Sequence, residues 1–156
     1  MKESTNPVLR RLDALVGEWQ VDVLGEDGVP VARSRSVFAW DGMLLVHHAE
    51  AEPPLPNTPP EWITHAPFPI TAVIGLDDLS GQFSMMYTDA RDVHRVYAMS
   101  MEGGVWKFWG QAGPEFHQRA TGTFTPDGNV IHALIERSAD GHHWETDFAS
   151  TYTKVK

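Results

Sequence analysis

The sequence predicts an all-β fold: a ten-stranded antiparallel up-and-down β-barrel preceded by one short N-terminal helix. Three observations support this prediction. Beyond residue 17, apolar residues recur at every second position, as they do in strands that bury one face. Asp-Gly, Gly-Gly and Pro-Asp-Gly turn sequences interrupt the alternation at intervals of roughly 8–12 residues. Closing such sequential hairpins into a barrel leaves no strand edge exposed.

Composition narrows the possible function classes. The 156 residues fit one domain, 1–156, and 42% of them are hydrophobic, as in ordinary globular proteins. A net charge of −9 opposes binding to the phosphates of nucleic acids. The absence of cysteine excludes disulfides, thiolate nucleophiles and cysteine-based zinc sites. Because no apolar signal segment or membrane-length apolar run is visible, we expect a cytoplasmic monomer or homodimer with no membrane partner.

The first element expected is a short amphipathic helix between residues 6 and 16. Asn6 suits the N-cap, Pro7 suits the first helical position, and Gly17 suits the end. The apolar stripe of this helix comprises Val8, Leu9, Leu12, Leu15 and Val16.

Ten strands follow, because each later segment alternates apolar and polar residues and ends at a turn sequence. Asp41-Gly42 is a strong hairpin signal between the second and third strands. The expected strands lie at about 18–23, 31–40, 43–51, 70–76, 83–90, 94–102, 105–112, 116–125, 129–138 and 144–154.

Residues 53–69 break the alternation. They hold seven of the eleven prolines, which lack the N–H that a sheet ladder needs, so this segment is expected to be a loop. Its apolar residues Leu55, Trp62, Ile63 and Phe68 are unusual for a linker between domains. We therefore expect a lid packed across an opening of the barrel, with Trp62 or Phe68 contacting bound ligand; a domain boundary is the alternative.

One motif resembles a known family. Gly17-Glu18-Trp19, after a short helix and at the start of the first strand, resembles the G-x-W motif of calycins: lipocalins, fatty-acid-binding proteins and nitrobindin-like barrels. The resemblance implies a barrel whose interior holds a hydrophobic ligand. Lipocalins place an arginine against the motif tryptophan near the end of the barrel, and Lys154 is the residue available here. The segments similar to bacterial lipocalin-like proteins of unknown function are 87–97, 118–122 and 138–144.

The hairpin of residues 83–102 is the first candidate site. If Arg91-Asp92 forms a two-residue turn, Asp89 lies opposite His94 at the rim, with Tyr87 beneath them. A carboxylate that orients an imidazole is a common general base, so these three residues are the catalytic candidates if the protein is an enzyme. The alternative is a structural ion pair. The same register sets the large Phe83, Met85 and Tyr87 opposite small residues, which would leave room for a ligand.

Three further residues are ligand-binding candidates. His47 lies on the drier face of its strand, so we expect it inside, either contacting ligand or hydrogen-bonded within the core. Trp106 belongs to a strand with aromatic residues on both faces and is expected to line the cavity. Arg119 either anchors a ligand carboxylate inside the barrel or lies outside in solvent.

Metals and cofactors are not expected. The only close histidine pairs, 47–48 and 142–143, are adjacent residues whose side chains diverge on a strand or lie beside a turn. No phosphate-binding loop, dinucleotide motif or nucleophile motif is present. The sequence therefore favours a protein that binds a small hydrophobic or aromatic metabolite. A cofactor-free isomerase, cyclase or hydrolase is the first alternative, and a haem protein is the second.

Overall fold

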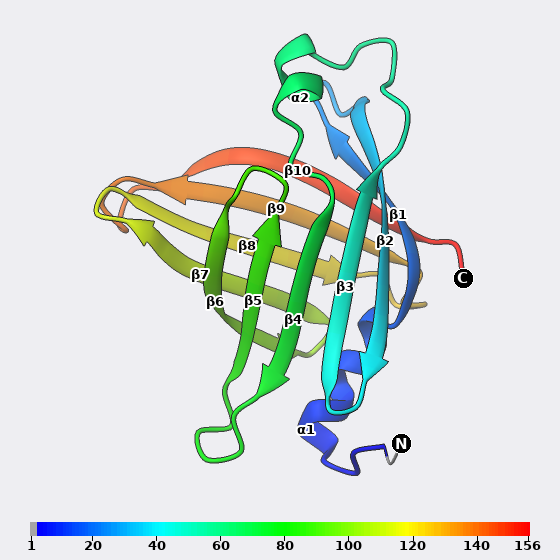
Figure 1. The fold of residues 1–156 in the computed structure, drawn as a ribbon, viewed down its shortest axis with the longest axis vertical. Helices are drawn as coiled ribbons and strands as arrows, with labels where there is room; N and C mark the ends of the chain where they lie inside the picture. The colour runs from blue at the N-terminus through cyan, green and yellow to red at the C-terminus, as the bar shows by residue number, and fades with distance from the viewer. Residues whose placement is uncertain (1–2) are drawn as a thin grey trace.

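The computed structural model describes residues 3–156 as one closed barrel of ten antiparallel strands (Figure 1). Each strand pairs with the next in the chain, and β1 closes the barrel against β10, so the predicted fold is confirmed. The strands are β1 Gly17–Leu24, β2 Pro30–Asp41, β3 Leu44–Ala51, β4 Ile70–Leu76, β5 Phe83–Asp89, β6 His94–Glu102, β7 Val105–Gly113, β8 Phe116–Phe124, β9 Val130–Ser138 and β10 Glu145–Lys154.

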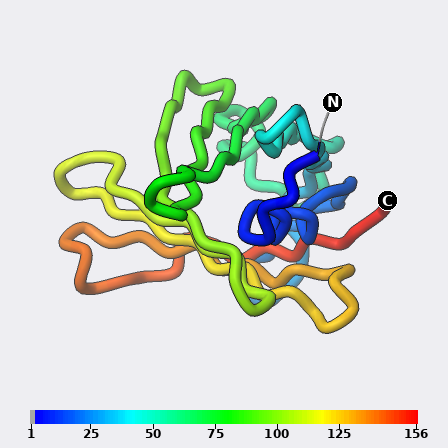
Figure 2. The backbone as a smooth tube through the Cα atoms, turned by 90° about the horizontal axis from the view of Figure 1, so that it is seen from below, coloured from blue at the N-terminus to red at the C-terminus, as the bar shows by residue number. Residues whose placement is uncertain are grey.

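The N-terminal helix forms as predicted, but its second half is a 3₁₀ helix rather than an α-helix. One α-helical turn, α1 (Pro7–Arg10), continues into a 3₁₀ helix, η1 (Arg11–Leu15). The Asn6 side chain accepts a hydrogen bond of 2.9 Å from the backbone N–H of Val8, which confirms the predicted N-cap. Seen from below, these turns lie against one end of the barrel (Figure 2). We call this the closed end.

The closed end is organised around Trp19. This side chain is fully buried, and its indole N–H donates a 2.8 Å hydrogen bond to the backbone oxygen of Leu15. Leu12 and Leu15 are also fully buried, so the N-terminal turns cover the tryptophan as expected. The Nζ atom of Lys154 lies 5.4 Å from the centroid of the Trp19 ring, a cation–π contact from the last strand.

The core fills the barrel from the closed end, because inward side chains alternate with outward ones on every strand. Phe38, Leu45, Ile74 and Met99 are almost completely buried there. In the opposite direction the inward side chains become polar and partly exposed, and we call that the open end. Among residues 3–156, no helix combines the length and apolarity needed to cross a bilayer.

The proline-rich segment lies at the open end (Figure 1) and differs from expectation in one respect. It contains a short helix, α2 (Pro60–Thr64), where a loop without helix was expected. The reason is local: Pro60 at the first helical position has its φ angle already set near the helical value. The side-chain amide of Asn57 donates to the Pro30 oxygen at 3.0 Å. The Thr58 hydroxyl bonds the Val31 oxygen, also on β2.

Candidate functional site

A row of aromatic rings lines the inside of the barrel. Tyr87 on β5 meets Tyr97 on β6 edge to face at 6.4 Å between ring centroids. Tyr97 meets Phe108 on β7 at 5.1 Å, and Phe108 meets Trp106 at 5.6 Å. Tyr87 and Phe108 keep partial exposure although they face inward. The row therefore runs from the solvent-accessible open end to the dry core.

Trp106 stands where this row enters the core. Its ring lies edge to face with Phe38 at 6.0 Å and with Tyr152 at 6.0 Å. Only 4% of its surface is exposed, yet its indole N–H has no hydrogen-bond partner among the described residues. Burial raises the pKa of Tyr152 to about 12, so its phenol stays protonated. The prediction that Trp106 faces inward is confirmed; its contact with a ligand stays a prediction.

His47 faces the interior, as predicted, and His48 faces out. The His47 ring stacks on Phe38 at 4.1 Å between centroids with an interplanar angle of 6°. Its Nε2 atom lies 2.9 Å from the Ser36 hydroxyl. Burial, helped by the nearby His48, lowers the pKa of His47 to about 3, so the ring is neutral at physiological pH. A neutral imidazole can donate and accept hydrogen bonds, and with so low a pKa it is a weak base.

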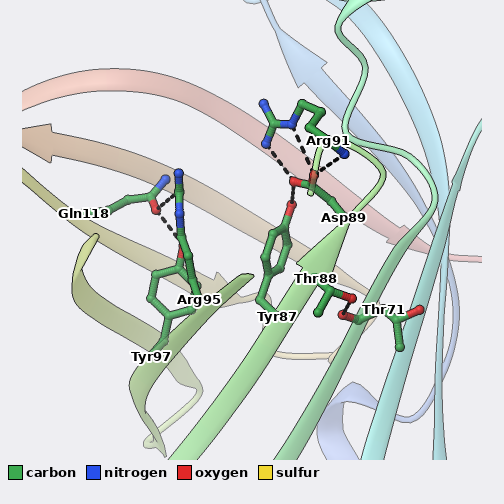
Figure 3. A network of polar contacts seen from close by, with 8 residues as sticks. All are labelled: Thr71, Tyr87, Thr88, Asp89, Arg91, Arg95, Tyr97 and Gln118. Atoms are coloured by element: carbon green, nitrogen blue, oxygen red, sulfur yellow. Dashed lines mark hydrogen bonds and ion pairs between the residues drawn. The ribbon is translucent and has the colours of Figure 1, made fainter. Parts of the chain in front are cut away.

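Tyr87 and Asp89 belong to a polar network at the open end (Figure 3). The Tyr87 hydroxyl donates to Asp89 at 2.8 Å, and the Arg91 guanidinium donates to the same carboxylate at 2.7 Å. The backbone N–H of Arg91 donates a further bond at 2.8 Å. Burial alone would raise the pKa of Asp89, but these hydrogen bonds outweigh it and lower the pKa to about 2. Burial, together with the bond to Asp89, raises the pKa of Tyr87.

The predicted pairing of Asp89 with His94 is wrong. Asp89 lies opposite Val93, because its N–H donates to the Val93 oxygen at 3.1 Å, and His94 lies opposite Thr88. The turn uses three residues, with Asp92 in the left-handed region at φ 61°, where two were expected. The shift of one position sends His94 to the outer surface, where it is exposed. A catalytic role that requires the two side chains to touch is therefore not supported by their positions.

The same shift changes what faces Phe83 and Met85. Both point inward and are buried, but they lie opposite Met99 and Tyr97 rather than opposite small residues. The expected space between large and small partners does not exist at this hairpin. Both residues belong to the core, and contact with a ligand stays a prediction for them.

Arg95 is the inward residue that sequence reasoning missed. It alternates with the buried Tyr97 on β6, and its Nη1 atom donates to the side-chain oxygen of Gln118 on β8 at 3.1 Å (Figure 3). The Tyr97 hydroxyl donates to the same oxygen at 2.7 Å. Both bonds pass over β7 at Gly110, where a Cβ atom would stand 3.2 Å from the Tyr97 ring.

The alternation contained the missing signal. Arg95, Tyr97, Met99 and Met101 form the set with the larger side chains, and that set lies inside. The turn assumed for this hairpin assigned the interior to the other set, which has smaller side chains.

Arg119 lies outside, so the first of its two predicted positions is wrong. Its guanidinium pairs with Glu136 at 2.9 Å and lies 4.0 Å from the centroid of the Trp144 ring. Even-numbered residues of β8 face inward, as the burial of Ala120 shows. Arg119 therefore cannot anchor a carboxylate within the barrel.

Trp62 and Phe68 occupy different positions in the proline-rich segment. Trp62, on α2, is 41% exposed, and Phe68 is partly buried just before β4. The segment also touches the β5–β6 turn, where the N–H of Ala90 donates to the Pro67 oxygen at 3.2 Å. It is thus held on both sides of the open end, while its role as a lid stays a prediction.

The histidines of residues 3–156 are not grouped as metal ligands. No three His, Asp or Glu side chains converge among residues 3–156. His143 pairs with Asp140 at 2.6 Å on the surface. The inward histidine, His47, lies flat on Phe38 and uses Nε2 for Ser36, an arrangement that does not suit an axial ligand of haem.

Two hollows lie away from these aromatic residues. One, of about 130 Å³, lies beside the β7–β8 and β9–β10 turns and is lined by Glu115, Arg137 and Glu145, among others. The other, of about 240 Å³, lies on the outer face of β6 and β7 beside Glu102 and Lys107. Neither hollow is lined by Trp106 or Tyr152.

Comparison with known proteins supports the fold. No family model and no curated protein matches the chain. Among solved structures, the chain is similar to that described as "Crystal Structure of Rv2717c from M. tuberculosis", with a TM-score of 0.56. The two share 15% identity, over 98% of this chain and 100% of the other. At this identity the likeness concerns the barrel fold alone.

Proposed function

We propose that this protein binds a small, largely apolar molecule with aromatic character inside its barrel. The molecule enters from the open end. The observation that carries the proposal is the buried indole N–H of Trp106, which has no hydrogen-bond partner in residues 3–156. Leaving such a donor unsatisfied costs about 1–3 kcal/mol, so unpaired buried donors are rare in folded proteins. An acceptor atom on a bound molecule would remove this cost.

The surroundings of Trp106 indicate what kind of molecule fits. Phe108 and Tyr152 offer ring faces and edges, and both keep partial exposure although they face inward. Aromatic surfaces of this kind give large contact areas at little cost in side-chain entropy. A planar, apolar body with one hydrogen-bond acceptor matches them best. The motif tryptophan and Lys154 at the closed end further support a calycin-like ligand-binding barrel.

The enzyme alternative has less support. Asp89 and His94 lie on opposite faces, and a histidine with a pKa near 3, as at His47, is a weak general base near neutral pH. Ser36 and His47 do lie within hydrogen-bond distance, but Ser36 is only 2% exposed. We therefore favour binding without chemical transformation.

The test is a binding titration with 1-naphthaleneethanol, a neutral aromatic alcohol, measured by isothermal titration calorimetry. We expect saturable binding of one molecule per chain. The Trp106→Phe variant should bind about fivefold more weakly, because one neutral hydrogen bond is worth about 1 kcal/mol. Trp109→Phe is the matched control, since Trp109 lies on the same strand but faces out and is 41% exposed. Absence of saturable binding, or equal effects of both variants, would contradict the proposal.

A further inference from the structure

We infer that the ligand carries a carboxylate or a similar planar anion, and that Arg95 receives it at the open end. This inference rests on the proposed function, because it assigns a chemical class to a molecule bound in the same barrel. It starts from the charges inside the protein. Arg95 faces inward on β6, in a chain with a net charge of −9.

Arg95 has no carboxylate partner. Within residues 3–156, no Asp or Glu oxygen lies within 4.0 Å of its guanidinium, although Arg33, Arg35 and Arg91 all form such pairs. Among the same residues, its guanidinium makes one hydrogen bond, from Nη1 to the side-chain oxygen of the uncharged Gln118. A guanidinium carries five N–H donors in a planar fork, so most of its donors are free.

The one acid drawn with Arg95 in Figure 3 is already bound to other groups. Asp89 accepts hydrogen bonds from Tyr87 and from the side chain and backbone of Arg91, and its side chain has no exposed surface. The ion pair between Asp89 and Arg91 also cancels the charge of both groups. Arg95 therefore supplies the uncompensated positive charge among the side chains of this network (Figure 3).

The position of Arg95 is built by its neighbours. Its guanidinium lies 5.4 Å from the centroid of the Phe116 ring, and the Gln118 oxygen holds one of its nitrogens. Gln118 is fixed in turn by the Tyr97 hydroxyl at 2.7 Å. The ring of Tyr97 begins the path through Phe108 to Trp106, in ring-to-ring steps of 5.1 and 5.6 Å.

Together these features define a ligand with two ends. The anionic end meets the planar fork of Arg95, which matches a carboxylate with two parallel hydrogen bonds. The aromatic body lies along Tyr97 and Phe108 toward the core, where an acceptor atom at its inner end meets the indole N–H of Trp106. The other cation drawn in Figure 3, Arg91, is already paired with Asp89. One positive charge is therefore available, so a monocarboxylate fits better than a phosphate with two charges.

The experiment compares two probes that share one aromatic body, 1-naphthaleneacetate and 1-naphthaleneethanol, by isothermal titration calorimetry. We expect the wild-type protein to bind the acetate about tenfold more tightly or better, since hydrogen bonds to charged groups are worth about 1.5–3 kcal/mol. Arg95→Gln should remove this preference and change the affinity for the alcohol by less than about twofold. Arg119→Gln, which alters an outward arginine, is the control and should change neither affinity.

The outcomes separate the two proposals. If the wild-type protein binds both probes equally, or if Arg95→Gln weakens both alike, the anion site is overturned while the binding function stands. If neither probe binds, both proposals fail. Should Arg95→Gln not fold, raising the salt from about 0.05 to 0.5 M tests the wild-type protein directly. Salt should weaken binding of the acetate alone, because screening acts on the charged pair; equal effects on both probes would overturn the inference.

Discussion

Two tryptophan sites inside this barrel differ in how completely the hydrogen bonds of their side chains are satisfied. At the closed end, Trp19 is buried, its indole N–H is bonded to Leu15, and Lys154 lies over its ring. Trp106, beside the β6–β7 turn, is nearly as buried, but its indole N–H has no hydrogen-bond partner within residues 3–156. Arg95, at the open end, has no carboxylate partner in the same part of the chain. Two tryptophans in one barrel thus separate stability from binding: the first completes the core, and the second is available to a ligand.

The largest effect that distinguishes the two tryptophan sites is expected at Trp19. Trp19→Ala should lower the free energy of unfolding by about 3–5 kcal/mol, because truncating a fully buried aromatic side chain leaves a cavity. Urea denaturation measures this. A loss below about 1 kcal/mol would show that the N-terminal turns and Trp19 do not hold the closed end together.

Acid should weaken the barrel through His47. The folded pKa of about 3 lies below the unfolded value of 6.5, so the unfolded chain binds one more proton between these values. Stability from the neutral ring is therefore complete above pH 6.5 and is lost as the pH falls toward 3, by at most about 1.4 kcal/mol per pH unit. Unfolding free energies at pH 7 and 4.5 should differ less in His47→Gln than in the wild type. Equal differences would contradict the buried, neutral position.

Asp89 and His94 offer a sharper comparison at the open end. Asp89→Asn should cost about 1–3 kcal/mol in unfolding free energy, because it breaks the buried network with Tyr87 and Arg91. His94→Ala should change stability by less than about 0.5 kcal/mol, since this side chain is on the outer surface. The contribution of Asp89 is present above about pH 4 and is lost as the pH falls toward 2, because its folded pKa is lowered. Equal costs for the two variants would contradict the position of His94 on the outer surface, away from the network of Asp89.

The smallest effect is expected from the proline-rich segment. Replacing residues 54–67 with a short Gly-Ser linker should leave the barrel folded but weaken binding of 1-naphthaleneethanol about fivefold. The segment is held to β2 through Thr58, and its prolines reduce the cost of ordering it. Leu79→Ser, in the exposed β4–β5 turn, is the control at the other end. Unchanged binding would show that the segment is no lid, and failure to fold would show that it belongs to the core.

The sequence predicted the strands better than the contacts between them. Alternation and turn residues locate ten strands and the N-cap at Asn6, because both signals act over a few residues. The face of β6 that points inward depended on one turn, Ala90-Arg91-Asp92, which contains no glycine or asparagine to mark its left-handed residue. A one-residue error there replaced Arg95 with His94 as the inward candidate.

Contacts across several strands were out of reach for a different reason. The bonds from Tyr97 and Arg95 to Gln118 span an intervening strand, and they exist because Gly110 leaves space between them. The unpartnered donor on Trp106 is likewise a property of everything packed around it. Such features depend on strand register and on side-chain packing together, and no local pattern encodes either.

In this barrel the indole N–H of Trp19 is already bonded and the indole N–H of Trp106 is available to a ligand. The most direct test of this difference is the NMR spectrum of the indole N–H groups. The chain has six tryptophans, so a ¹⁵N-labelled sample gives one indole signal from each. On addition of 1-naphthaleneethanol, we predict that the Trp106 signal moves downfield as its N–H gains an acceptor. The Trp19 signal should stay in place, because its bond to Leu15 is already made. Movement of Trp19 or of the outward Trp109 with Trp106 unchanged would contradict the account.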